Sequence, residues 1–133
     1  MKIIIDATGA NLGRTSSFVA KQALLGHEIV IVNAEKAIVS GKPKMIADAY
    51  TSIRVKGGTS QKGPNFPSRP EFIFKRTIRG MLSYKQERGR AAFKRVMCYQ
   101  GVPQEFANAE KILMRSERKG SSMTLEQLSG RLK

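Results

Sequence analysis

The chain has 133 residues, which suits one domain, because single cores usually form from about 100 to 200 residues. Its 24 Lys and Arg outnumber its 10 Asp and Glu, so the formal net charge is +14, and an excess of this size indicates a polyanionic partner such as a nucleic acid or an acidic membrane surface. One cysteine and one histidine exclude an internal disulfide and effectively exclude a zinc site, so we expect no metal and no other cofactor.

The first third of the chain is predicted to be a βαβ unit. Residues 3–5 and 29–32 are continuous aliphatic runs, the pattern of parallel strands that are covered on both faces. Between them Asn11 is expected to cap a helix that Gly26 ends. The apolar positions of this helix are Leu12, Val19, Ala20 and Ala23.

A second helix is predicted from Pro43 to about Val55, with an apolar stripe formed by Met45, Ala49 and Ile53. Residues 57–70 follow. They contain three Gly and three Pro, and they are therefore expected to form a loop that suits close approach to phosphates. Phe66 in this loop has two open roles, stacking on a base or folding back on the protein.

A third helix is predicted after Pro70. Its inward stripe is Phe74, Ile78, Met81 and Leu82, whereas Lys75, Arg76 and Arg79 share another face.

A fourth helix is predicted over residues 87–95, with Ala92, Phe93 and Val96 directed inward. A short strand over residues 96–99 should then stop at Gly101-Val102-Pro103. The remaining tail shows only one weak helix, around residues 125–132.

Positive charge is concentrated in residues 54–95, which contain twelve cations against the two acids Glu71 and Glu87, and so hold ten of the fourteen net positive charges. An ordinary solvated face mixes both signs, so this asymmetry predicts an RNA-binding surface. The RNA-binding candidates are Arg14, Arg54, Lys56, Lys62, Arg69, Lys75, Arg76, Arg79, Lys85, Arg88, Arg90, Lys94 and Arg95.

Signals that resemble enzyme motifs are incomplete. The turn from Gly9 to Thr15 has three residues between its glycines, where a phosphate-binding Walker A loop needs four, and Arg14 stands in place of its Lys. Asp6 has no recognisable catalytic partner and is expected to stabilise a turn, while Cys98 is expected to be a small core residue and His27 a surface residue. A nucleotide-using enzyme and a DNA-binding module remain the alternatives to an RNA-binding structural protein.

Several motifs, in order along residues 1 to about 106, resemble those of the universal large-subunit ribosomal protein L-thirteen family. They are DATGANLGR at 6–14, VIVNAEK at 30–36, SGK at 40–42, KGP at 62–64, IRGML at 78–82, and RGR at 88–90 leading to GVP at 101–103. The spacing looks like that of the archaeal and eukaryotic branch. Ser83, where the family usually has Pro, and Lys62, where this branch usually has Arg, are local departures.

The resemblance implies an α/β fold, three layers α/β/α around a small mainly parallel sheet, in a single domain with a basic loop and a helical C-terminal extension. We divide it into a βαβα half (1–56), the basic loop (57–70), basic helices with a strand (71–106) and the extension (107–133). It implies a structural constituent of the large ribosomal subunit with no enzymatic activity. The expected partners are large-subunit ribosomal RNA and neighbouring ribosomal proteins, with no membrane and no small-molecule substrate, and the expected location is the cytoplasm.

Overall fold

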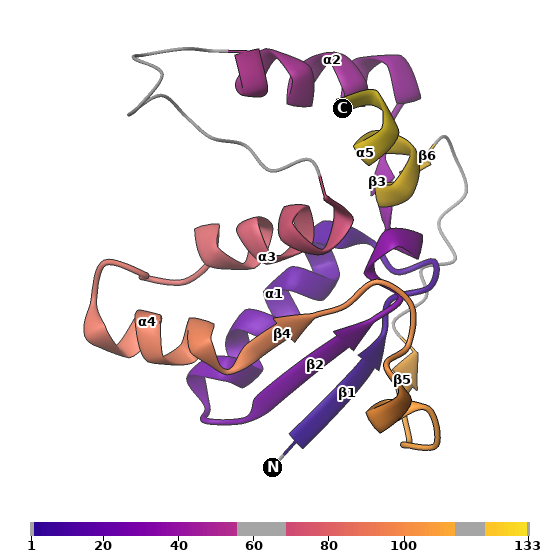
Figure 1. The fold of residues 1–133 in the computed structure, drawn as a ribbon. Helices are drawn as coiled ribbons and strands as arrows, with labels where there is room; N and C mark the ends of the chain where they lie inside the picture. The colour runs from indigo at the N-terminus through magenta and orange to yellow at the C-terminus, as the bar shows by residue number, and fades with distance from the viewer. Residues whose placement is uncertain (1, 56–68, 114–121, 133) are drawn as a thin grey trace.

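The computed structural model of the chain describes residues 2–55, 69–113 and 122–132 (Figure 1). Its elements, in chain order, are β1 (Lys2–Asp6), α1 (Leu12–Leu24), β2 (Glu28–Val32), the 3-10 helix η1 (Ala34–Lys36), β3 (Ile38–Ser40), α2 (Pro43–Val55), α3 (Pro70–Gly80), α4 (Glu87–Lys94), β4 (Val96–Cys98), the 3-10 helix η2 (Gln104–Phe106), β5 (Ile112–Leu113), β6 (Ser122–Thr124) and α5 (Leu125–Leu132).

The main sheet is parallel and has the strand order β4-β2-β1-β5. Its register aligns Ile3 with Ile29, and Ile29 in turn with Val96, so these side chains point to one face of the sheet. By the same alternation Val30 and Met97 point to the other face. The prediction of an α/β fold with a mainly parallel sheet is confirmed, as is the βαβ unit that begins it.

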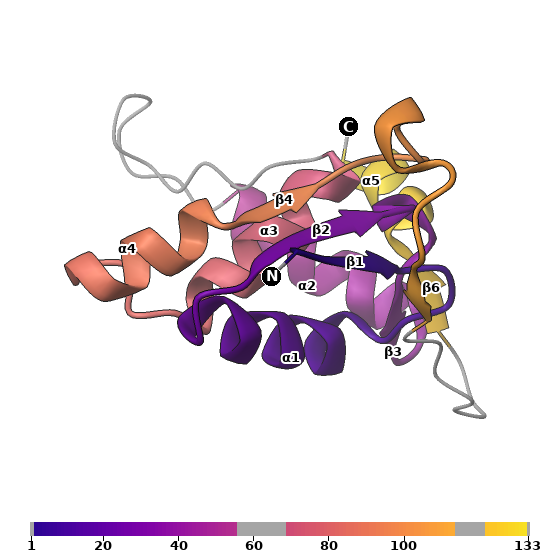
Figure 2. The same cartoon turned by 90° about the horizontal axis from the view of Figure 1, so that it is seen from below.

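The two faces of the sheet are covered by different structures. On one face Ile5, Ile29 and Ile31 are buried in a single core cluster with residues of α1 and α3. On the other face Val30 and Val32 pack against Phe106 of η2. Figure 2 shows α1 on one side of the strands, opposite the short orange turn that contains η2. In the part of the chain that the structure describes, the third layer therefore consists of η2 and its flanking turns.

Both ends of α1 are stabilised as the sequence predicts. The side-chain oxygen of Asn11 accepts hydrogen bonds from the backbone N–H groups of Gly13 and Arg14, which have no partner within the helix. At the other end Gly26 has φ +98°, and the N–H of His27 donates to the carbonyl of Gln22. This is the glycine-ended motif that closes many helices.

The bounds predicted for α2 are confirmed, but its predicted apolar stripe is wrong. Met45 is 67 % exposed and Ala49 is also exposed, whereas Ile46 and Ala47 are buried. A four-residue spacing rotates by 40° at each step, so it does not fix a face by itself. The face is fixed by α5 and β6, against which α2 packs.

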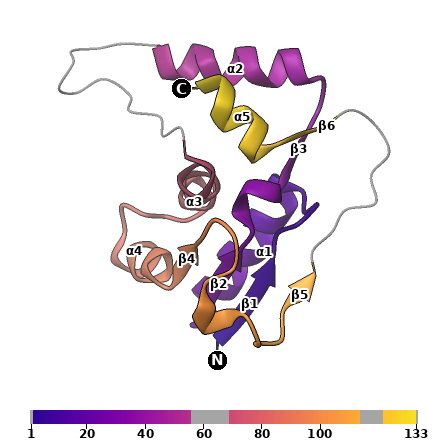
Figure 3. The same cartoon turned by 45° about the vertical axis from the view of Figure 1, so that its right-hand side comes forward.

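The helix α5, which the sequence predicts only weakly, belongs to the main core. Leu125 and Leu128 are completely buried within it. Strand β6 pairs with β3 in an antiparallel two-stranded sheet, and Figure 3 shows α2 and α5 together above the main sheet. The sequence did not predict β3, β5 or β6.

The inward residues of α3 are mostly confirmed. Phe74, Ile78 and Leu82 are buried, but Met81 is 44 % exposed. Because α3 ends at Gly80, Met81 leaves the helical periodicity, and Ile73 takes an inward position instead. The predicted helix α4 and strand β4 are present, with Ala92 and Val96 buried.

Candidate nucleic-acid interface

The helix α3 has an apolar face and a basic face. Phe74 and Ile78 are completely buried against the core. On the opposite side lie Phe72, Lys75, Arg76 and Arg79, which follow the spacing i, i+3, i+4, i+7 of one helical face. The helix is therefore held by its apolar side and presents three cations and one aromatic ring on the other.

A tight turn connects α3 to α4, and we refer to residues 79–90 as the α3–α4 corner. Buried Leu82 anchors the turn, while the N–H of Gln86 donates to the carbonyl of Ser83 at 2.9 Å. Gly89 is also buried, and a Cβ atom added to it would lie 2.0 Å from the carbonyl oxygen of Ser83. Only a glycine at this position lets the first turn of α4 pack against the turn.

The cations of the α3–α4 corner are directed to solvent. Arg88 and Arg90 flank the buried Gly89 and are both exposed, as are Arg79 and Lys85. Glu87 is the acidic residue in this stretch. The corner is a fixed backbone that carries four exposed cations, an arrangement suited to several simultaneous phosphate contacts.

The structure assigns different environments to the predicted RNA-binding residues. Seven are exposed: Arg14, Arg69, Arg79, Lys85, Arg88, Arg90 and Lys94. Lys75, Arg76 and Arg95 are half-buried, and Arg95 donates a hydrogen bond to the backbone of α1. Arg14 lies on a different helix, in the first turn of α1. Lys56, Lys62 and the side chain of Arg54 lie outside the described residues, as does nearly all of the predicted loop 57–70.

Three cations of α3 and its N-cap lie over aromatic rings. The guanidinium carbon of Arg79 is 4.8 Å from the ring centroid of Tyr84, and that of Arg69 is 5.9 Å from the ring centroid of Phe72. The ammonium of Lys75 is 5.1 Å from the ring centroid of Phe93. Phe72 and Tyr84 were not predicted from the sequence as functional residues. Phe72 could have been found from its distance of seven residues to Arg79, because this interval places both side chains on one face of a helix.

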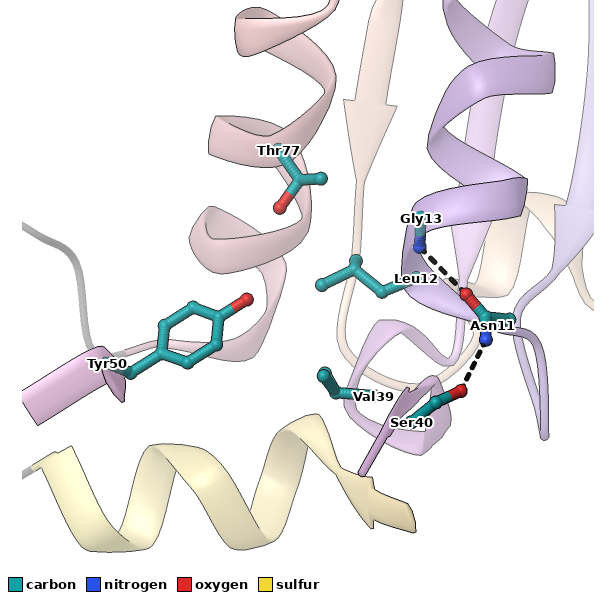
Figure 4. Close-up of a pocket in the computed structure, with 7 residues that line it drawn as sticks. All are labelled: Asn11, Leu12, Gly13, Val39, Ser40, Tyr50 and Thr77. Atoms are coloured by element: carbon teal, nitrogen blue, oxygen red, sulfur yellow. Dashed lines mark hydrogen bonds between the residues drawn. The ribbon is translucent and has the colours of Figure 1, made fainter. Parts of the chain in front are cut away.

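A pocket of about 320 Å³ lies where the incomplete phosphate-loop motif begins α1 (Figure 4). Asn11 and Gly13 line it, together with Ser40, Tyr50 and Thr77. The Asn11 amide donates to the Ser40 hydroxyl at 2.8 Å while its oxygen caps the helix, so both ends of this side chain stabilise the fold. Burial raises the pKa of Tyr50, although the nearby charge of Arg76 opposes this.

Asp6 stabilises a turn, as the sequence predicts. Its Oδ1 accepts hydrogen bonds from the backbone N–H and the hydroxyl of Thr8, at 3.0 and 2.7 Å, and from the Asn33 amide at 3.1 Å. Burial alone would raise the pKa of Asp6, but these hydrogen bonds and the charge of Lys36 together lower it below its ordinary value.

Cys98 packs against the main core, as predicted, and burial raises the pKa of its thiol to about 12. Within residues 2–55, 69–113 and 122–132, no three or more His, Cys, Asp and Glu side chains are grouped so that they could hold a metal ion. None of the helices described is long and apolar enough to cross a membrane.

Comparison with known proteins identifies the family. Residues 1–105 match the family model described as ribosomal protein L13. The chain belongs to the ribosomal protein L13 family. This confirms the resemblance carried by the ordered motifs, over almost the same range.

Similar proteins of the L13 family come from archaea. Each of the following is named large ribosomal subunit protein uL13. The protein of Methanosarcina barkeri is 53 % identical over 110 residues, covering 82 % of this chain and 78 % of its own length. That of Archaeoglobus fulgidus is 49 % identical over 107 residues, covering 80 % and 68 % respectively. That of Methanococcoides burtonii is 46 % identical over 121 residues, covering 91 % and 84 %.

Membership of the L13 family decides between the open functional classes. The family consists of structural components of the ribosome, not of enzymes, so this L13 family member is not a nucleotide-using enzyme. The archaeal relatives also agree with the branch indicated by the motif spacing.

Proposed function

We propose that this chain is a structural constituent of the large ribosomal subunit in the cytoplasm and that it binds the RNA of that subunit through the α3–α4 corner. One observation supports this location of the RNA-binding surface. The turn is held by buried Leu82 and Gly89, and it presents four exposed cations, Arg79, Lys85, Arg88 and Arg90. A ribosomal location implies contact with RNA and with neighbouring ribosomal proteins.

The mechanism is multivalent neutralisation of phosphates. RNA segments repel one another when they pack together, and each cation that meets a phosphate lowers this repulsion and releases a bound counterion. Because the corner is folded before it binds, little conformational entropy is lost in presenting its charges. The protein thus lowers the cost of packing several RNA segments together, with shape and charge supplying most of the recognition.

The basic residues outside the corner extend the same surface in this proposal. Arg69 is exposed at the N-cap of α3, and Lys94 is exposed at the end of α4. Lys56, Lys62 and the side chain of Arg54 are assigned to RNA binding on their sequence alone.

Reversing two charges in the corner tests the placement. Arg88→Glu with Arg90→Glu should prevent stable incorporation into large subunits, because it removes two phosphate contacts and adds repulsion, at about 1.5 to 3 kcal/mol for each charged hydrogen bond. The fold should survive, since both residues are exposed in the first turns of α4, where the helix dipole favours acidic residues. The measurement is co-sedimentation of the tagged protein with large subunits, with thermal melting of the free protein.

The matched control is Lys42→Glu with Lys44→Glu. Both residues are exposed; Lys42 precedes α2 and Lys44 is its second residue, so the charge change is the same and also falls at a helix N-terminus. This variant should still enter large subunits. If the Arg88/Arg90 variant sediments like the wild type, or if both variants fail equally, the α3–α4 corner is not the RNA-binding surface.

A further inference from the structure

Among the described residues, the aromatic side chains that are exposed are Phe72 and Tyr84, at 46 % and 39 %. Both lie in the basic segment, in or just after α3. Each has an arginine guanidinium over its ring, Arg69 over Phe72 and Arg79 over Tyr84. The other described aromatic residues are buried or half-buried.

This pairing gives each ring a function beyond packing. An exposed aromatic ring has an apolar face that water solvates poorly, so a ligand with a flat apolar face is favoured to cover it. A guanidinium over the ring is itself planar and cationic, so each pair combines a flat apolar ring with a flat, positively charged group stacked on it. An unpaired base is flat, apolar on its faces and joined to a phosphate, so it matches that surface.

The backbone holds the two pairs in a fixed relation. Phe72 and Arg79 are seven residues apart in α3, which puts them on one helical face about 10 Å apart along the axis. Lys75 and Arg76 lie between them on this face. Tyr84 follows buried Leu82, and the N–H of Tyr84 donates to the Leu82 carbonyl at 2.8 Å, which fixes the start of the ring's side chain.

We propose that Phe72 with Arg69 and Tyr84 with Arg79 are two stacking platforms for unpaired RNA bases, and this rests on the proposed RNA-binding function. The ligand is a single-stranded segment, such as a loop or a bulge. Bases in an A-form duplex are stacked on each other and cannot reach an aromatic ring, so a duplex would engage only the cations.

The test uses variants that change no charge. Phe72→Leu and Tyr84→Leu retain apolar volume but remove the aromatic face. The probe is a 12-nucleotide RNA of mixed sequence without self-complementarity, and the same strand annealed to its complement. Each variant should bind the single strand about 5- to 150-fold more weakly than the wild type, the range expected for one lost base–aromatic stack. Binding to the duplex, and the salt dependence of binding to either RNA, should not change.

Tyr84→Phe and Met97→Leu are the controls. Tyr84→Phe keeps a ring and should retain binding to the single strand. Met97 is 43 % exposed on the sheet, so Met97→Leu changes the shape of an exposed apolar side chain elsewhere and should have no effect. Two results would show that Phe72 and Tyr84 are not stacking platforms. Both Leu variants could bind the single strand like the wild type, or they could lose as much affinity for the duplex as for the single strand. If the wild type binds neither RNA, the proposed function itself fails.

Discussion

Nη1 of Arg95 donates a hydrogen bond of 2.8 Å to the carbonyl oxygen of Ala23. Ala23 lies in the last turn of α1, where its carbonyl also accepts from the N–H of Gly26 at 3.1 Å, and Arg95 follows the last residue of α4. The backbone carbonyl of Arg95 also accepts from the N–H of Ile29. One residue of the basic segment therefore connects two helices and a strand, and its charge serves the fold.

Arg95→Ala should lower the free energy of unfolding by about 1 to 3 kcal/mol, because the hydrogen bond from a charged donor is lost and the Ala23 carbonyl keeps only the bond from the N–H of Gly26. Urea unfolding measures this. Lys94→Ala is the control, since Lys94 is exposed beside it and its removal should change stability by less than about 0.5 kcal/mol. Equal stability of Arg95→Ala and Lys94→Ala would show that the contact with Ala23 contributes nothing.

Gly89→Ala should destabilise the protein. The added Cβ would meet the carbonyl oxygen and carbon of Ser83 at 2.0 and 2.3 Å, which are backbone atoms that cannot rotate away, so α4 or the turn before it must shift. Such overpacking costs about 1 to 3 kcal/mol or more. RNA affinity should fall in the same variant, because the shift displaces Arg88 and Arg90. Thermal melting and RNA titration are the two measurements.

Gly130→Ala gives the opposite result and serves as the comparison for Gly89→Ala. Gly130 lies in α5 with nothing within 4 Å of an added Cβ, so alanine should stabilise that helix by about 0.5 to 1 kcal/mol. A gain in stability from Gly89→Ala would mean that the close packing of Gly89 on Ser83 is not present in solution.

The affinity for RNA should fall steeply with salt. Six residues between 69 and 95 are exposed cations: Arg69, Arg79, Lys85, Arg88, Arg90 and Lys94. If each neutralises one phosphate, the slope of log affinity against log salt is about −4 to −5.5, at roughly 0.7 to 0.9 per phosphate. Filter binding of a large-subunit RNA fragment from 50 to 300 mM salt tests this. A nearly flat dependence would exclude the electrostatic mechanism.

The local sequence determines much of this fold. The aliphatic runs at 3–5 and 29–32 predict β1 and β2 because strands buried on both faces are continuously apolar, and Asn11 and Gly26 mark the ends of α1 by their own chemistry. β3, β5 and β6 were not predicted. They have only two or three residues, so no periodicity can develop, and they exist because distant strands pair with them.

The sequence predicted which segment carries the positive charge of the candidate interface, but not which of its side chains are exposed. Composition alone located the basic segment, yet it could not separate Arg95, which contacts Ala23, from exposed Lys94. The exposed positions of Met81 and Tyr84 depend on where α3 ends, and a helix end shifts every later residue away from the helical period. Tertiary structure therefore decides which members of a charged segment are available to a ligand.

Asp6→Asn should lower stability at neutral pH and lose that effect in acid. The Asp6 carboxylate joins the end of β1 to Thr8 and to Asn33 at the end of β2, and its pKa in the folded protein lies below the ordinary value of 3.8. A group with a depressed pKa contributes stability above its unfolded pKa, and this contribution is lost as pH falls through the folded pKa. Asparagine still accepts the hydrogen bonds but has no charge, so the deficit at pH 7 should be up to about 1 kcal/mol.

The measurement for Asp6→Asn is the difference in free energy of unfolding between wild type and variant from pH 7 to pH 2.5. Other carboxyl groups titrate in both proteins and cancel, so the difference isolates Asp6. It should be constant from pH 7 to about pH 5 and should shrink below 3.8, where the unfolded state takes up a proton before the folded state does. A difference that does not change with pH, or that grows in acid, would mean that the Asp6 charge does not stabilise the junction between β1 and β2.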